Sequence, residues 1–345
     1  MSTDTPADNT MASANPRPGT MRAITQDRYG NADVLYPAHV QRPVAGDGQV
    51  LVRVRAAGLD RGTEHLLTGK PYAVRLARGL RRPKNPVPGR DVAGIVAEVG
   101  AGVDGFTVGD EVYGVAPGSF AEYALTTPDK LTRKPADVSF AQAAVVPISG
   151  GTALQAVTGA GRLQPGQTVL VTGASGGVGS YAVQIARALG AEVTGVSSPA
   201  KTDYVRAIGA HHVLTYPHDD WADGTRQWDL IIDVAGNPSI RQLRRALTPR
   251  GTAVFVGGEN AGALVGMHRQ IRGAMLSPFV GQQLVPLLAR EHANHYERLT
   301  TLIEAGQLDP VLDRTYPLEK AADAMRHLAR GEVRGKVAVV ISGRG

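Results

Sequence analysis

The sequence predicts an α/β protein with two parts, a β-rich first part and a doubly wound parallel sheet. Its 345 residues exceed what one ordinary core needs, which favours two domains. Short β-like runs separated by turns fill the chain from Met21 to about Pro147. From about Ser139 onward, strand-like and helix-like runs alternate with short loops, the pattern typical of a parallel sheet.

The first part has the character of a small, irregular β-barrel with few helices. Its strands are predicted at residues 49–54 and 92–99, and turns lead into further strands at 109–112 and 118–123. Ser139 is well placed to cap a short helix over 139–146.

The second part contains the elements of the parallel sheet. Strands are predicted at 168–172, 192–196, 230–234 and 252–256, and helices at 177–189, 201–208 and 239–247. The chain is then expected to be mostly helical to about Gly306, before a helix to about Ala329 and a strand at 336–341 that rejoin the first part. The expected organisation is a disordered tail over 1–20, a first domain over 21–147 with 300–345, and a nucleotide-binding domain over 148–299.

Composition excludes several classes of site and partner. The chain has no cysteine, so disulfides and cysteine-based zinc, haem and iron–sulfur sites are impossible. The net charge of +6 is modest, and no nucleic-acid partner is expected from it. One local basic cluster (Arg75, Arg78, Arg81, Arg82 and Lys84) either contacts an anionic ligand or forms a solvated loop. No apolar stretch approaches the ~20 residues that span a bilayer, so we expect a cytoplasmic protein without a membrane partner.

A glycine-rich turn lies between a predicted strand and a predicted helix. It reads Gly173-Ala174-Ser175-Gly176-Gly177-Val178-Gly179. Such a turn brings backbone N–H groups and a helix N-terminus to a pyrophosphate, and its position between strand and helix supports dinucleotide binding.

The residues after the next strand favour NADPH. Sheets that prefer NAD carry an acid there for the ribose 2′-hydroxyl, whereas this strand ends at Ser197-Ser198. Both hydroxyls can donate to a 2′-phosphate, and Lys201 either adds charge or is a solvated lysine. Tyr216 either reaches the cofactor or packs in the core. Further cofactor contacts are expected where later strands end, at Ala235, Gly236, Gly257 and Gly258.

Several segments together resemble the medium-chain dehydrogenase/reductase superfamily, in its zinc-free quinone oxidoreductase (zeta-crystallin-like) branch. They are residues 88–94 (PGRDVAG), 109–112 (GDEV), 118–123 (GSFAEY), the glycine turn, 208–213 (IGAHHV) and 335–337 (GKV). The likeness covers nearly all of residues 21–341. It implies a GroES-like catalytic domain against a Rossmann domain, with the active site in the cleft between them.

The resemblance also implies site residues. Zinc members have a histidine where this chain has Arg90, so no metal is expected. Asp60 replaces an asparagine that the family has near the nicotinamide, and Tyr72 either donates to a substrate oxygen or packs. Thr152 matches a threonine that faces the cofactor, or else is an N-cap. Phe279 and Val280 match the family segment that approaches the nicotinamide.

The expected function is NADPH-dependent hydride transfer to a quinone, an enone or a related carbonyl compound, by a homodimer like many relatives. Two alternatives stay open. One is a zinc-free NADP-dependent alcohol or ketone dehydrogenase. The other is an NADPH-binding regulatory or RNA-binding protein with weak catalysis.

Overall fold

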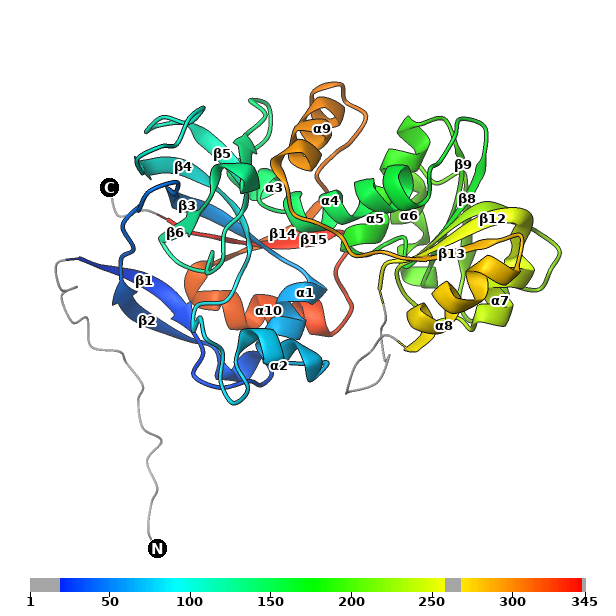
Figure 1. Ribbon diagram of the computed structural model, residues 1–345, viewed down its shortest axis with the longest axis horizontal. Helices are drawn as coiled ribbons and strands as arrows, with labels where there is room; N and C mark the ends of the chain where they lie inside the picture. The colour runs from blue at the N-terminus through cyan, green and yellow to red at the C-terminus, as the bar shows by residue number, and fades with distance from the viewer. Residues whose placement is uncertain (1–18, 258–267, 343–345) are drawn as a thin grey trace, which may run out of the picture.

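The computed structural model describes residues 19–257 and 268–342 as two lobes joined by helices (Figure 1). The expected tail over 1–20 lies almost entirely outside the described residues. One lobe is built on a seven-stranded sheet and the other on a six-stranded sheet. None of the described helices is long and apolar enough to cross a membrane.

The six-stranded sheet is parallel throughout, in the order β10-β9-β8-β11-β12-β13. Its strands are β8 (Thr168–Thr172), β9 (Glu192–Ser197), β10 (His212–Thr215), β11 (Trp228–Asp233), β12 (Leu247–Phe255) and β13 (Gln283–Pro286). The doubly wound prediction is therefore confirmed. β13 was missed, because four residues ending in proline at a sheet edge resemble the loops around them.

The seven-stranded sheet is mixed and follows the path β14-β15-β3-β4-β5-β7, with β6 paired to β3. Its strands are β3 (Val50–Leu59), β4 (Asp91–Val99), β5 (Glu111–Val115), β6 (Tyr123–Thr126), β7 (Leu131–Arg133), β14 (Leu312–Pro317) and β15 (Lys336–Val340). β15 pairs antiparallel with β3, so the end of the chain joins the sheet of the first part. A separate hairpin joins β1 (Thr20–Thr25) to β2 (Tyr36–Gln41).

Helices cover the sheets and fill the space between them (Figure 1). The α-helices are α1 (Arg61–Thr68), α2 (Ala73–Arg78), α3 (Phe140–Ala143), α4 (Pro147–Leu154), α5 (Gly177–Ala188), α6 (Thr202–Ala207), α7 (Ile240–Ala246), α8 (His268–Leu276), α9 (Ala293–Glu304) and α10 (Ala321–Ala329). Ser139 caps α3 through a capping box, as the sequence predicts.

One hydrophobic core connects the two lobes. It includes Ala93 and Tyr113 from one sheet and Val169 from the other. The Tyr113 hydroxyl, buried between them, donates to the backbone oxygen of Tyr296 at 2.8 Å. Because this core is continuous across the junction, the two lobes pack directly against each other.

Candidate active site

The glycine turn is built so tightly that two of its glycines have no room for a side chain. Gly173 has φ +64°, and a Cβ there would lie 2.8 Å from the Ala235 Cβ. A Cβ on Gly179 would lie 2.1 Å from the Gly173 carbonyl oxygen. The turn and the start of α5 therefore pack backbone against backbone.

The N-terminus of α5 presents unsatisfied donors. The helix begins at Gly177 after the N-cap Gly176, which has no side chain to cap it. The N–H groups of Gly177, Val178 and Gly179 lie in the first turn, where no helical carbonyl can accept from them. Together with the positive end of the helix dipole, these donors fit a pyrophosphate.

The two serines at the end of β9 have different environments. The Ser197 hydroxyl is buried and donates to the Ser198 carbonyl at 3.2 Å, so it is engaged within the protein. Ser198 is half-buried, and its hydroxyl has no hydrogen-bond partner in the described part of the chain.

Lys201 is neither solvated nor free. Its ammonium donates to the backbone oxygens of Gly331 at 2.6 Å and Val333 at 2.8 Å, and burial lowers its pKa. It therefore fastens the loop before β15 to the end of β9. Arg334 in that loop donates to the Ala200 carbonyl at 3.2 Å and brings a second cation here. Arg334 could not be placed here from the sequence, because it is 134 residues from Ala200 along the chain.

Tyr216 stands beside this group on the surface. It follows β10, its N–H donates to the Ser197 carbonyl at 3.2 Å, and it is 57% exposed. The alternative that it packs in the core is wrong. Ser198, Lys201, Tyr216 and Arg334 therefore gather around the end of β9, and we call them the β9-end cluster.

The later strands end beside the glycine turn. Ala235 packs against Gly173, and a side chain on Gly236 would enter open space at φ +90°. Gly257 donates its N–H to the Asp233 carbonyl at 3.2 Å. Gly258 lies outside the described residues.

The segment expected to approach the nicotinamide follows α8. Phe279 is 84% exposed at the end of a 3-10 turn (Ser277–Phe279), and Val280 is half-buried. The Phe279 ring therefore does not line a closed cleft in this conformation.

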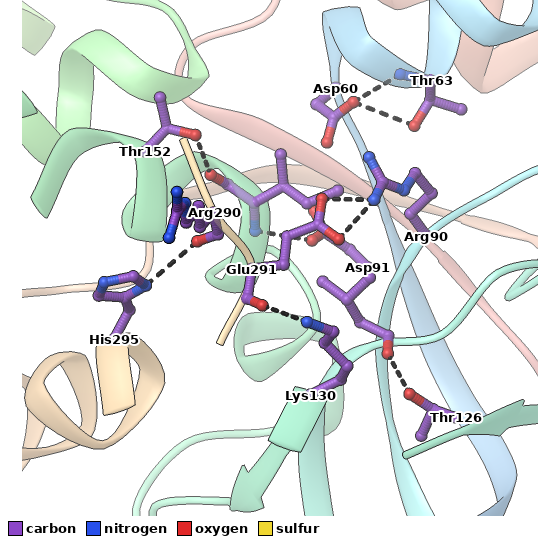
Figure 2. A network of polar contacts seen from close by, with 12 residues as sticks. Asp60, Thr63, Arg90, Asp91, Thr126, Lys130, Thr152, Arg290, Glu291 and His295 are labelled. Carbon is purple, nitrogen blue, oxygen red and sulfur yellow. Dashed lines mark hydrogen bonds and ion pairs between the residues drawn. The ribbon is translucent and has the colours of Figure 1, made fainter. Parts of the chain in front are cut away.

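Thr152 lies inside α4, so it is not an N-cap. Its hydroxyl donates to the Ile148 carbonyl one turn earlier at 2.6 Å (Figure 2). The side chain is half-buried, which leaves it open to a neighbour in the cleft.

Asp60 and Tyr72 have different environments. Asp60 is the N-cap of α1, because its Oδ1 accepts from the Thr63 N–H at 2.6 Å and hydroxyl at 3.0 Å (Figure 2). Its Oδ2 is buried without a hydrogen bond. Tyr72 is 43% exposed, with the Arg75 guanidinium 4.8 Å from its ring centroid. Of the two side chains, Tyr72 is therefore the one that is open to solvent.

A buried charge cluster that no local sequence pattern indicates lies next to the glycine turn. The Lys336 ammonium lies 3.3 Å from Asp91 Oδ2 and 3.8 Å from Asp60 Oδ2, and 3.0 Å from the Ser149 hydroxyl. Burial raises the pKa of Asp91 to about 7, and the nearby Asp60 charge adds to this while Lys336 opposes it.

This cluster supports the turn directly. A Cβ on Gly177 would lie 3.0 Å from the Lys336 Cδ, and the Gly335 N–H donates to the Ser175 carbonyl at 2.9 Å. Lys336 at the start of β15 and Gly335 just before it thus hold the glycine turn against the other lobe.

A second polar network crosses the lobes at a pocket of about 690 Å³ (Figure 2). Arg90 forms an ion pair with Glu291, whose backbone oxygen accepts from the Lys130 ammonium at 2.6 Å. Arg90 is thus held by a carboxylate at the place where the resemblance puts a zinc-ligating histidine in other members.

Comparisons with known proteins agree with this architecture. Residues 46–136 match the alcohol dehydrogenase GroES-like domain family, and residues 208–339 match the zinc-binding dehydrogenase family. The chain is 31% identical to the chloroplast envelope quinone oxidoreductase homolog of Arabidopsis thaliana, over 92% of this chain and 98% of that protein. It is 30% identical to the quinone oxidoreductase of Homo sapiens, over 90% of this chain and 94% of that protein.

Solved structures agree as well. The quinone oxidoreductase from Coxiella burnetii superimposes with a TM-score of 0.82 at 28% identity, covering 94% of this chain and all of that one. The two lobes are accordingly a GroES-like domain and a Rossmann domain that binds a nicotinamide nucleotide. The chain belongs to the medium-chain dehydrogenase/reductase superfamily, in its quinone oxidoreductase branch, and is an oxidoreductase acting on a small molecule.

Proposed function

We propose that the protein is a zinc-independent, NADPH-dependent reductase that transfers a hydride to a quinone, an enone or a related carbonyl compound. The observation that carries the choice of NADPH is the β9-end cluster, which holds two cations, a half-buried hydroxyl and an exposed phenol. A 2′-phosphate is dianionic near neutral pH and fits such a set, whereas an acid for a free ribose hydroxyl is missing there.

The donor set does not fit a catalytic zinc ion. The chain has no cysteine, and Arg90 is neutralised by Glu291 instead of offering a lone pair. No group of three or more His, Cys, Asp or Glu side chains in the described ranges is arranged to hold a metal. Substrate polarisation is therefore assigned to hydrogen bonds.

Each part of the site has a proposed task. The first-turn N–H groups of α5 bind the pyrophosphate, and Thr152, Ala235, Gly236 and Val280 border the rest of the cofactor. The bound nicotinamide supplies the hydride. Tyr72 donates a hydrogen bond to the acceptor oxygen as negative charge develops on it. Asp60, buried and engaged in capping α1, has a positioning role.

Steady-state turnover tests the proposal. Oxidation of NADPH and of NADH is measured against a benzoquinone, a short enone and an aldehyde, with the protein treated with chelator beforehand. We expect NADPH oxidation with the quinone or the enone, unaffected by chelator. Oxidation of simple alcohols with NADP⁺ without quinone reduction would favour the dehydrogenase instead, and a salt-sensitive RNA complex without turnover would favour a binding protein.

Substitution of Arg334 tests the cofactor preference. Arg334→Ala removes a charge-assisted partner of the 2′-phosphate, so we expect the KM for NADPH to rise roughly tenfold or more. The KM for NADH should stay within about twofold, since NADH lacks that phosphate. Arg330→Ala, which removes an exposed cation paired with Glu332, is the control. An equal rise for both cofactors in Arg334→Ala would count against the assignment.

A further inference from the structure

We propose that residues 72–84 dock the protein onto the surface of an anionic lipid bilayer. This stretch, here called the docking segment, comprises α2 and the loop after it. Its leucines enter the interfacial layer while its cations lie among the lipid headgroups. The expectation of no membrane partner rests on the lack of an apolar stretch long enough to span a bilayer, and a surface that lies on a bilayer needs no such stretch.

The net positive charge of the chain is concentrated in this segment. The docking segment contains five Lys and Arg and no Asp or Glu. The whole chain has 37 Lys and Arg and 31 Asp and Glu, so without these five it would have 32 against 31. Most of the positive net charge of the sequence therefore comes from this segment.

The cations are available to a partner. Arg78, Arg81, Arg82 and Lys84 are exposed, and none of them forms an ion pair within residues 19–257 and 268–342. Anionic headgroups attract such groups at the surface.

Large apolar side chains lie between these cations. Leu76 is 75% exposed and Leu80 is 67% exposed. None of the residues of α2 is fully buried, so the helix lies at the surface of the protein. Leu76 in α2 and Leu80 in the loop after it are therefore available, beside the cations, to enter the interfacial layer of a bilayer.

The segment is nevertheless fixed to the protein. Arg75 lies over the rings of Tyr29 and Tyr72, at 4.6 and 4.8 Å from their centroids, and donates to the Gly69 carbonyl at 3.1 Å. The Tyr29 hydroxyl donates to the Gly79 carbonyl at 2.7 Å. A preformed surface of this kind pays little ordering entropy when it binds.

These features favour lipid over nucleic acid. Binding to single-stranded RNA uses free aromatic faces for stacking on bases, and the Tyr72 ring is already occupied by Arg75. The exposed leucines would gain nothing from phosphodiesters, but they gain from burial in the acyl boundary.

The location gives docking a use. α2 follows α1 and lies next to it (Figure 1), and α1 is capped by Asp60, which is assigned to the cleft. Contact with a bilayer would bring the cleft close to acceptors dissolved in it. This use rests on the proposed reduction of apolar quinones, whereas docking itself does not.

Co-sedimentation with lipid vesicles tests the proposal. The full chain is mixed with vesicles of phosphatidylcholine alone and with vesicles containing 30% phosphatidylglycerol, at low and high salt. We expect binding to the anionic vesicles that weakens with salt. Arg78→Gln/Arg81→Gln/Arg82→Gln and, separately, Leu76→Ser/Leu80→Ser should each lower binding by about tenfold or more.

Matched variants control for charge and apolar surface in general. Arg226→Gln/Arg241→Gln/Arg250→Gln removes three exposed arginines of the Rossmann domain. Val44→Ser/Val108→Ser removes two valines that are 74% and 67% exposed, which are nearly the same exposed fractions as those of Leu76 and Leu80. Both control proteins should bind as the unmodified protein does, and all variants should keep its circular dichroism spectrum.

Several results would overturn docking: no binding to anionic vesicles, full binding by the leucine variant, equal losses in the controls, or binding to an RNA oligonucleotide but not to vesicles. Turnover separates docking from the proposed function. Vesicle binding without quinone reduction would contradict the proposed function and support docking. Quinone reduction without vesicle binding would support the proposed function and contradict docking. If both hold, the leucine variant should lose rate with a long-chain quinone in vesicles and keep it with a water-soluble one.

Discussion

Replacement of Gly179 by alanine is expected to abolish nucleotide binding. The new Cβ would lie 2.1 Å from the Gly173 oxygen, 2.8 Å from the Gly173 carbonyl carbon and 2.9 Å from the Ala174 Cα. All three are backbone atoms, so the turn must move away from the helix that presents its donors. We expect a loss of NADPH affinity of about 100-fold or more, and a loss of about 1–3 kcal/mol in the free energy of unfolding.

Titration of NADPH binding by calorimetry, together with urea unfolding, measures both effects. Gly159→Ala is the control, because Gly159 is exposed in a helical segment and a Cβ there meets nothing within 4 Å. The control should bind NADPH normally and be no less stable. Undiminished binding by Gly179→Ala would mean that the cofactor does not rest on this turn.

Lys336→Met is expected to cause the largest loss of stability. Methionine fills a similar volume, but it leaves the buried carboxylates of Asp91 and Asp60 facing no cation. Breaking a buried pair in this way costs about 3–5 kcal/mol. Adding Asp91→Asn should recover part of the loss, because it removes the charge left unpaired. Urea unfolding of the two single variants and the double variant gives the coupling energy.

The sign of the pH dependence follows from Asp91. Its pKa is raised from 3.8 to about 7 in the folded protein, so its stabilising contribution is complete below pH 3.8 and is lost as the pH rises toward 7. The Lys336 charge opposes the rise in the Asp91 pKa, so the loss of Lys336 should raise that pKa further. The deficit of Lys336→Met should therefore be larger at pH 8 than at pH 5.

An exposed ion pair provides the control. Lys320→Met breaks a pair of 3.7 Å with Asp323 in which the lysine side chain is 64% exposed, and it should cost less than about 1 kcal/mol. A similarly small cost for Lys336→Met, at either pH, would show that the buried cluster is dispensable.

The parts of the site that could be predicted are those encoded within a few consecutive residues. The glycine turn, its strand and its helix lie within residues 168–188, and their periodicity and glycine spacing predict this local structure and the proposed nucleotide site. The short strand β13 was missed because four residues carry too little pattern. The direction of the Ser197 hydroxyl and the partners of Lys201 could not be predicted either, since each depends on which backbone oxygen lies within hydrogen-bonding distance after folding.

The sequence by itself determined the family, the parallel sheet, the glycine turn and the lack of cysteine ligands, because each follows from composition or from the spacing of nearby residues. Only the tertiary structure decided that Asp60, Asp91, Ser149 and Lys336 share one buried cluster, and that Arg334 joins Lys201 at the end of β9. Strand β15, near the C-terminal end of the chain, pairs with β3 from the first part of the sequence. Gly335, just before β15, donates to Ser175 in the glycine turn, near the middle of the sequence. Such contacts depend on which distant segments the common core brings together, and no pattern of neighbouring residues in the sequence predicts which segments will meet.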